Sequence, residues 1–429
     1  NCFIFPPSKV TKSHDWNMIL ANDLKGLKHM MTKNWMIFQL LLILVSFQAN
    51  SKALNTGPWR FELKTTNAVV PFIINFKYFK NKLTGELING KEKIKLSDMI
   101  IDDKTLSIPL QTYEVTLNMK RSTDVYMSGE LVRHNKNPKV TIPVQASFGQ
   151  KYRYPQDKYT AAINLQGKWS VTMKDEDGVV SPGILIFDQQ KEKLSGTIMT
   201  PTGDYRYFEG FVSNKNFEAA SFDGVFNYVL RGELKDKVLK AALLSNSITN
   251  IEGTLDPKAS LPDPYKHTQV EALNFSFPDL KGNLISLNDK RFKNKPVVVQ
   301  FFGSWCPNCM DEMNFLIPWY NQNQKRGVEI IALAFERSVD PTEAKKQLIK
   351  VSTKKKVPYP LLIGGSTSED KPKDKISGLK NFISFPTTVF LNKRHEVVKV
   401  HAGFTGPSTG EYFIQWKNEF NQTINGLLK

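Results

Sequence analysis

Two cysteines with two residues between them carry the clearest chemistry in the sequence. Cys306 and Cys309 lie in "FFGSWCPNCMDE" (301–312), and Cys2 is the only other cysteine. Such a pair can bind a metal, brace the chain as a disulfide, or exchange electrons with another disulfide. A zinc site needs about four ligands, and neither a second CxxC nor a His pair accompanies this one. A disulfide that closes so short a loop stabilises a fold little, so redox exchange is favoured over the other two uses.

The flanking residues predict the elements that hold the pair. "VVVQFF" (297–302) has the composition of a buried strand, and residues 306–325 are expected to form a helix that begins at Cys306. Pro307 suits the first helical turn, where its missing N–H costs nothing. Unpaired backbone N–H groups and the helix dipole stabilise a thiolate at this position. Cys306 can then attack a substrate disulfide, and Cys309, one turn further on, can resolve the mixed disulfide.

Strands and helices are expected to alternate over the C-terminal part of the chain. Such alternation indicates an α/β domain. The further strands are predicted at 328–335, 359–365, 387–392 and 396–404, and the further helices at 341–355 and 408–427.

Four segments of this region are similar to segments of the extracytoplasmic TlpA/ResA-like thiol–disulfide oxidoreductases, which have the thioredoxin fold. "FFGSWCPNCMDE" resembles their active-site turn. "FSFPDLKGNLISLND" (275–289) resembles their N-terminal hairpin, and "ISFPTTVFLN" (383–392) resembles their cis-proline segment. "HAGFTGPSTGEYF" (401–413) resembles their last strand and helix entry. The resemblance covers about residues 267–429 and implies a thioredoxin-like domain that works as a protein disulfide reductase.

The resemblance also implies roles for individual residues. Cys306 aligns with the nucleophilic cysteine, Cys309 with the resolving one, and Pro386 with a cis proline that shapes substrate docking. It implies no cofactor beyond the Cys306–Cys309 disulfide. It further implies protein disulfide or dithiol substrates, such as apocytochrome c, and a membrane-bound or soluble thiol electron donor. The residues expected to line the substrate groove are Trp305, Pro307, Asn308, Phe385 and Thr387.

Gln300 and Glu312 distinguish the site from that of an ordinary thioredoxin. Ordinary thioredoxins carry a buried aspartate six residues before the first cysteine, where this chain has Gln300, which cannot titrate. Glu312 matches the glutamate that TlpA/ResA-like proteins carry three residues after the second cysteine. A buried carboxyl on the helix face of Cys309 would have a raised pKa and could transfer a proton; the alternative is a solvated helix glutamate. Asp311 is expected to be the exposed neighbour, and Glu336 to approach the site from a strand end.

Two other functions compete with the reductase. Peroxiredoxins share the fold, but they place a threonine three residues before the reactive cysteine, where Gly303 stands here. This difference counts against a peroxidase. In the other alternative, β-domains in the N-terminal half bind a ligand or an envelope component, and the thioredoxin-like domain is an accessory.

The N-terminal half is expected to consist of β-strands, because short apolar runs with period-two alternation are separated by turn-forming residues. "TGPWRFEL" (56–63) resembles "QGKWSVTM" (166–173), and "NKLTGELI" (81–88) resembles "EKLSGTIM" (192–199). Both offsets are about 110 residues, which predicts two repeated units resembling barrels or sandwiches. The predicted domain bounds are 54–150, 165–255 and 267–429, and residues 256–266 are expected to be a linker.

The first 53 residues are expected to be absent from the mature protein. Lys33 precedes the uncharged run "MIFQLLLILVSF" (36–47), and small residues lead to Ala53. This pattern predicts a secretory signal over about residues 30–53. An uncleaved segment that attaches the protein to the membrane is the alternative, although the run is shorter than the ~20 residues that span a bilayer. We therefore expect a periplasmic or otherwise extracytoplasmic protein.

The charge balance does not indicate a nucleic-acid partner. The 429-residue chain has a net charge of +17, but its lysines often alternate with apolar residues, as in "GKEKIKLSDM" (90–99). Solvated sheet faces explain this pattern. The hydrophobic fraction of 41% is that of a protein with a folded core.

Overall fold

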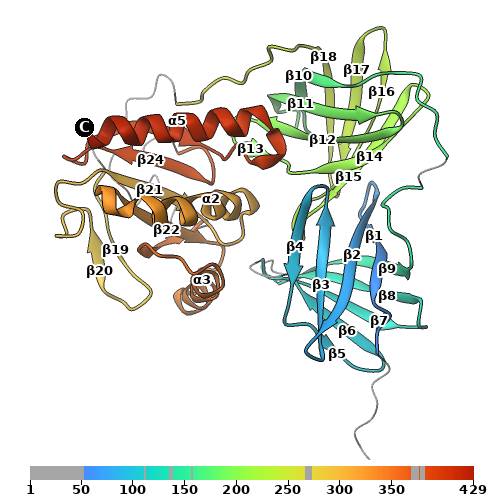
Figure 1. The fold of residues 1–429 in the computed structure, drawn as a ribbon, viewed down its shortest axis with the longest axis horizontal. Coiled ribbons are helices and arrows are strands. Elements are labelled where there is room, and N and C mark those ends of the chain that lie inside the picture. The colour runs from blue at the N-terminus through green and yellow to red at the C-terminus, as the bar shows by residue number, and fades with distance from the viewer. Residues whose placement is uncertain are drawn as a thin grey trace, which may run out of the picture. The chain divides into compact units, whose positions relative to one another are not determined.

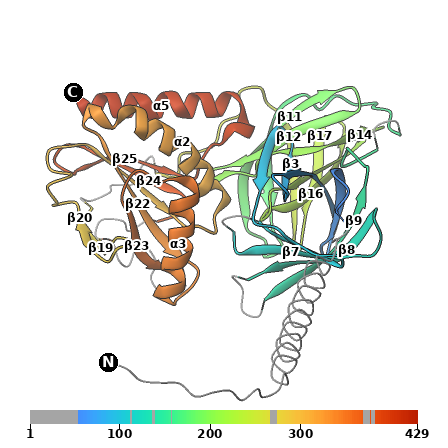
Figure 2. The same ribbon diagram turned by 60° about the horizontal axis from the view of Figure 1, so that its bottom comes forward.

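The computed structural model describes residues 53–110, 113–134, 139–155, 158–265, 273–368, 376 and 382–429. The expected signal segment lies outside these residues. Leu54–Lys429 form one compact unit, whose strands and helices are drawn in Figures 1 and 2. No helix in the described part of the chain is both long enough and apolar enough to cross a membrane.

The first β-rich part is an antiparallel sheet built from nine of the described strands. Their order is β4-β3-β2-β1-β9-β8-β7-β6-β5. Along β1, Trp59, Phe61 and Leu63 are fully buried while their neighbours are not, as expected for a sheet with one buried face. The strands are β1 (Gly57–Lys64), β2 (Val69–Phe79), β3 (Lys82–Asn89), β4 (Glu92–Leu96), β5 (Ile100–Ile101), β6 (Thr105–Pro109), β7 (Val115–Arg121), β8 (Tyr126–Arg133) and β9 (Val140–Phe148).

The second β-rich part is a closed barrel. Its described strands follow the order β11-β10-β18-β17-β16-β15-β14-β12-β13, and β11 also pairs with β12, which closes the sheet on itself. Trp169, Phe187 and Phe217 are among the buried side chains that fill it. The strands are β10 (Gly167–Lys174), β11 (Val180–Gln190), β12 (Lys193–Thr200), β13 (Gly203–Asp204), β14 (Phe208–Ser213), β15 (Asn216–Phe222), β16 (Asn227–Lys235), β17 (Val238–Leu244) and β18 (Ile248–Leu255).

The two segments that suggested a repeat occupy similar places in these two sheets. One lies in β1 and the other in β10, and each strand pairs with the next strand in the chain. The indole N–H of Trp59 donates to the carbonyl of Asn55 at 2.9 Å, and that of Trp169 donates to the carbonyl of Leu165 at 2.8 Å. The first sheet, in contrast, has β4 and β5 at its two ends. A repeat of one unit therefore stays a prediction.

The C-terminal part is a five-stranded sheet with helices, drawn in yellow to red in Figure 1. The described strand order is β23-β22-β21-β24-β25, in which β21, β22 and β23 are parallel and β24 is antiparallel to both of its neighbours. A small hairpin, β19–β20, precedes this sheet. The elements are β19 (Ser276–Pro278), β20 (Leu284–Ser286), β21 (Val297–Phe302), α2 (Pro307–Asn323), η1 (Gln324–Arg326), β22 (Glu329–Glu336), α3 (Pro341–Lys355), β23 (Leu361–Ser366), β24 (Thr387–Leu391), β25 (Val397–Ala402), η2 (Pro407–Thr409) and α5 (Glu411–Leu428).

Both faces of this sheet are buried, so β21 is apolar on both sides, as a covered parallel strand should be. Val298 and Phe302 pack in the same core as side chains of α2, α3 and α5. Val297, Val299 and Phe301 pack on the other face, in a core that includes residues near the hairpin. Because side chains alternate along a strand, Gln300 lies on the helix-covered face.

Local signals set the starts of two helices. Cys306 is the N-cap of α2, followed by Pro307 in the first turn. Asp340 is the N-cap of α3, and its Oδ1 accepts the N–H of Thr342 at 2.8 Å. A side-chain acceptor followed by proline is a common start of a helix, and α3 has the bounds that its sequence predicts.

Candidate active site

The two cysteines are joined in a disulfide where β21 passes into α2. The Sγ of Cys306 accepts the backbone N–H of Cys309 at 3.2 Å. Cys306 is 5% exposed, whereas Cys309 is fully buried, so the first sulfur is the one that a partner can reach. After reduction, a thiolate on Cys306 would face this N–H and the positive end of the helix dipole, which favours the nucleophilic form.

The carboxyl group of Glu312 is fully buried between α2 and the sheet. Thr388 Oγ1 donates to its Oε1 at 2.6 Å, and Gln300 Nε2 donates to its Oε2 at 2.8 Å. Gln300 Nε2 also lies 3.4 Å from the carbonyl oxygen of Cys309. Burial raises the pKa of Glu312 to about 7, although the two hydrogen bonds act in the opposite direction. A carboxyl group with this pKa can accept and donate a proton at neutral pH, so Glu312 is not a solvated helix glutamate.

Thr388 is a residue of the site that the sequence did not indicate. β24 runs antiparallel to β21, with Thr388 directly opposite Gln300. Side chains at opposite positions of paired strands lie on the same face, and both of these contact Glu312. The available signal was the pair of threonines at the start of an otherwise apolar strand. Its meaning depended on the pairing of β21 with β24, which lies far along the chain.

Two aromatic residues and the cis proline lie next to Cys306. Cys306 Sγ is 3.7 Å from the carbonyl oxygen of Phe385, and the Phe385–Pro386 peptide bond is cis. The rings of Trp305 and Phe385 meet edge to face at 5.5 Å. The indole N–H of Trp305 donates to the carbonyl of Phe335 at 3.0 Å, which fixes the ring beside the cysteine.

The other predicted groove residues are close to the cysteines but present little side-chain surface. Pro307 is buried in the first turn of α2. Thr387 is fully buried, and its Oγ1 donates to the carbonyl of Ser384 at 2.7 Å. Asn308 is only 8% exposed, and its Oδ1 is buried with no hydrogen-bond partner.

Glu336, at the end of β22, lies behind the turn that precedes Cys306. Its Oε1 accepts the backbone N–H of Ser304 at 2.9 Å, and its Oε2 accepts the Ser304 hydroxyl at 2.6 Å. Burial raises the pKa of Glu336 to about 7. Through Ser304, this carboxyl group holds the turn that places Cys306 at the start of α2.

The prediction that Asp311 is exposed is wrong. Its side chain is 13% exposed and forms an ion pair with Arg206 of the second β-rich part, the closed barrel, with Nη2 and Oδ1 2.9 Å apart. Burial raises the pKa of Asp311 to about 7, against the opposing effect of Arg206. Helical periodicity could not reveal this position, because the residues that cover Asp311 belong to another domain.

Together, these features define a class of protein. A CxxC disulfide at the start of a helix, a cis proline beside it and a five-stranded sheet with this order are the features of a thioredoxin-fold protein built for thiol–disulfide exchange. Residues 268–400 match the AhpC/TSA family.

Curated relatives define the family more closely. The thiol-disulfide oxidoreductase ResA of Halalkalibacterium halodurans is 30% identical over 145 residues, which cover 34% of this chain and 74% of the relative. The ResA of Bacillus cereus is 35% identical over 146 residues, which cover 34% of this chain and 75% of the relative. A thiol:disulfide interchange protein of the thioredoxin family from Chlorobium tepidum is a similar solved structure, with 19% identity, a TM-score of 0.28 and coverage of 38% of this chain and 99% of that one. Through its C-terminal domain, the chain belongs to the ResA-like family of thiol–disulfide oxidoreductases.

Proposed function

We propose that this protein is an extracytoplasmic protein disulfide reductase, with Cys306 as nucleophile, Cys309 as resolving cysteine and Glu312 as proton acceptor. The observation that carries the proposal is the buried carboxyl group of Glu312, which is linked through Gln300 to the backbone of Cys309. A resolving thiol must lose its proton before it can attack. A buried carboxyl group with a pKa of about 7 can take that proton near neutral pH.

The reaction would proceed in two exchanges. The Cys306 thiolate attacks one sulfur of the substrate disulfide, forms a mixed disulfide and releases a substrate thiolate, which is protonated by solvent. Cys309 then transfers its proton to Glu312 and attacks the sulfur of Cys306. The Cys306–Cys309 bond forms, the second substrate sulfur leaves, and a proton returns to it. The substrate thus gains two electrons and two protons, and the CxxC pair loses them.

The disulfide must then be reduced again by a donor. The proposed donor is a thiol protein, in the membrane or soluble, and no cofactor besides the Cys306–Cys309 pair is needed. Dithiothreitol can replace the donor in a test. The chain from Leu54 onward should catalyse dithiothreitol-dependent reduction of insulin, and Cys306→Ser should not. Equal rates for the two proteins would refute the proposal, and hydrogen peroxide consumption by the unsubstituted protein would favour a peroxidase instead.

The direction of electron flow and the location of the protein have separate tests. Thioredoxin-fold redox pairs range from about −270 mV for a reductant to about −120 mV for a strong oxidant, and a reductase should lie toward the first value. A titration of Cys306–Cys309 against glutathione or dithiothreitol measures this potential.

For export, mass spectrometry of the protein from its native cells should find a mature N-terminus near Leu54; a retained segment 30–53 would indicate an anchor.

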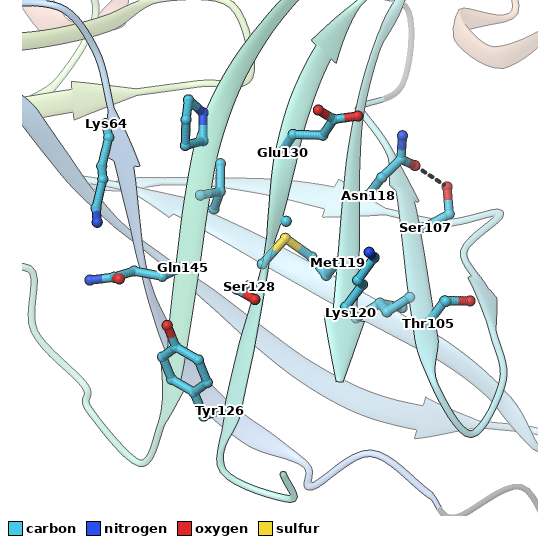
Figure 3. A pocket seen from close by; sticks show the side chains of 14 residues that line it. Lys64, Thr105, Ser107, Asn118, Met119, Lys120, Tyr126, Ser128, Glu130 and Gln145 are labelled. Carbon is cyan, nitrogen blue, oxygen red and sulfur yellow. Dashed lines mark hydrogen bonds between the residues drawn. The ribbon is translucent and has the colours of Figure 1, made fainter. Parts of the chain in front are cut away.

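A hollow on the first β-sheet favours ligand binding as a second candidate function. It has a volume of about 820 Å³ and is lined by side chains from β6 to β9 together with Lys64. Figure 3 shows polar and charged groups, among them Lys120, Glu130 and Gln145, around this hollow. Ser107 and Asn118 both line the hollow, and the Ser107 hydroxyl donates to Asn118 Oδ1 at 3.0 Å. Such a mixed surface could hold a polar ligand of moderate size.

Native mass spectrometry can test this second candidate. A small molecule should remain bound to the full chain and should be lost in Ser128→Trp, which fills the hollow. The matched control is Ser122→Trp, which places the same ring on an exposed turn outside the hollow. Identical spectra for all three proteins would refute ligand binding at this site.

A further inference from the structure

Residues 200–206 of the barrel, which lead from the end of β12 through β13 and are called the turn below, lie directly against the CxxC motif. Gly203, in this turn, packs on the side chain of Asn308, which stands between the two cysteines. A Cβ atom on Gly203 would be 2.1 Å from Asn308 Nδ2, so either the turn or the Asn308 side chain would have to move. Gly203 also has φ of +132°, which strongly favours glycine. The barrel therefore presents bare backbone to the active site.

A second close approach joins the same turn to the loop after β25. A Cβ atom on Gly403 would be 2.2 Å from the carbonyl carbon of Thr202. Beside it, Asp204 Oδ2 accepts the N–H of Gly406 at 2.6 Å, and Asp204 Oδ1 accepts the hydroxyl of Ser408 at 2.8 Å. Asp204 is almost completely buried. These contacts attach the turn to the loop that follows β25, on the thioredoxin-like domain itself.

Arg206 holds the other end of the turn. It is 5% exposed. Its Nη2 lies 2.9 Å from Asp311 of α2 and 2.5 Å from Glu92 of β4, and its Nη1 lies 2.7 Å from Asp223. Separating a buried guanidinium from three carboxyl groups would leave buried charges unpaired, which is strongly destabilising. Arg206 thus joins residues of both β-domains to α2, at Asp311, two residues after Cys309.

These contacts leave little of the active site uncovered. Asn308 is covered by the turn, and Cys306 retains 5% of its surface. The half-buried rings of Trp305 and Phe385 lie beside Cys306. The sulfur is therefore recessed, next to these aromatic rings and two residues from Asn308, on which the turn packs.

We infer that the turn Thr200–Arg206 is a specificity-determining wall of the active site, which admits cysteines on extended, flexible segments and excludes those set in a folded surface. The inference rests on the proposed disulfide exchange. A narrow slot admits a single extended chain, whereas a folded surface would collide with the wall before its sulfur reached Cys306. The second β-domain would thus select substrates by shape. This role is separate from any binding of a ligand by the first β-domain.

Alkylation of Cys306 tests the wall without requiring disulfide exchange. The reduced chain from Leu54 onward, carrying Cys309→Ser so that one thiol remains, would be reacted with a maleimide on a short unstructured peptide. The same group on a surface lysine of a folded protein would be the second reagent. We expect the peptide to react about tenfold faster than the folded protein. The ratio of the two rate constants cancels changes in the intrinsic reactivity of the thiol.

Two variants loosen the wall from opposite sides. Gly203→Ala should displace the turn, because a φ of +132° is strained for alanine, and Asn308→Ala should remove the side chain on which the turn rests. Each should lower the ratio of the two rate constants to about one third, or less, of its value in the Cys309→Ser chain. Gly282→Ala is the matched control, because Gly282 also has a positive φ, of +94°, but has nothing within 4 Å of its Cβ position. If Gly203→Ala does not fold, Asn308→Ala decides the question.

The results separate the wall from the proposed function. A ratio near one in the Cys309→Ser chain without further substitution, or an equal ratio in all variants, would overturn the wall, whatever the insulin assay shows. A high ratio that falls in Gly203→Ala or Asn308→Ala, but not in Gly282→Ala, would support it. If insulin reduction is absent while the ratio behaves as expected, the reductase is refuted and the restricted access to Cys306 stands.

Discussion

Replacing Glu312 with glutamine should stabilise the protein at alkaline pH and slow its reaction. The native pKa of Glu312 is about 7, compared with 4.5 for an ordinary glutamate. Below pH 4.5 the carboxyl group is protonated in both the native and the unfolded chain, so it makes no pH-dependent contribution. As the pH rises from 4.5 to 7, the unfolded chain loses the proton that the native state keeps. Native stability therefore falls with rising pH over this range and stays low above it.

The size of this effect follows from the difference between the two pKa values. At about 1.4 kcal/mol for each pH unit, the rise from 4.5 to about 7 amounts to about 3–4 kcal/mol. Glutamine has nearly the same shape and does not ionise. Thr388 can still donate to its oxygen, and Gln300 Oε1, which is buried without a partner, can accept from its amide after the Gln300 amide rotates. The free energy of unfolding of Glu312→Gln, relative to that of the original protein, should thus be about 3–4 kcal/mol higher at pH 8 than at pH 4.

Urea unfolding of the oxidised chain from Leu54 onward at several pH values between 4 and 8 measures this difference. The control is Glu343→Gln, which removes a carboxylate that is 55% exposed on α3 and should leave the pH dependence nearly unchanged. A stability difference between Glu312→Gln and the original protein that is constant from pH 4 to 8 would refute the assignment of a buried, neutral carboxyl group.

The same substitution should slow the resolution of the mixed disulfide. Without a proton acceptor at position 312, the Cys309 thiol must lose its proton to solvent, and general-base catalysis commonly contributes about a hundredfold or more. Stopped-flow measurement of the second exchange, with the attack by Cys306 observed separately, isolates this step. A gain in stability together with a loss of rate would be the signature of a group kept for catalysis. An unchanged rate of resolution would remove Glu312 from the mechanism.

Other side chains give further tests. Glu336→Ala removes the acceptor of two buried Ser304 donors and should lower the free energy of unfolding by about 1–3 kcal/mol for each donor left unpaired; Ser304→Ala, measured by the same urea titration, should cost less. Arg206→Met leaves Asp311 without its cation and should cost about 3–5 kcal/mol at pH 8 but less at pH 5, where the carboxyl group is protonated; calorimetry at the two pH values checks this. Cys309→Ser should accumulate a mixed disulfide with an oxidised substrate, visible by mass spectrometry, and its absence would contradict the order of attack.

Local sequence was sufficient to predict the elements that hold the cysteines. The apolar run 297–302 is β21, and the helix after it begins with Cys306 as N-cap, because a buried strand and a proline in the first helical turn are short-range signals. α3 likewise follows from its Asp-Pro start. The burial of Glu312 on the face of Cys309 also follows from helical spacing. These features depend on residues a few positions apart.

The rest of the site depends on contacts between distant segments. Thr388 joins the carboxyl group of Glu312 only because β24 pairs with β21 in one register. Glu336 reaches Ser304 because β22 is parallel to β21 and ends beside the same turn. In both cases the residue is visible in the sequence as a polar group in or after an apolar strand, but its partner is not. Strand order and register carry that information, and an isolated sequence shows neither.

The two adjacent acidic residues of α2 show why helical spacing led to one correct and one wrong prediction. Successive residues of a helix point about 100° apart, so Glu312 and Asp311 cannot face the same surroundings. Glu312 points toward the sheet and accepts a hydrogen bond from Thr388, whereas Asp311 points toward the closed barrel and pairs with Arg206. A face of α2 that would be solvated in an isolated thioredoxin-like domain is therefore a contact between domains. Substitutions of Asp311 should accordingly act through the placement of the turn Thr200–Arg206, and those of Glu312 through the proton of Cys309.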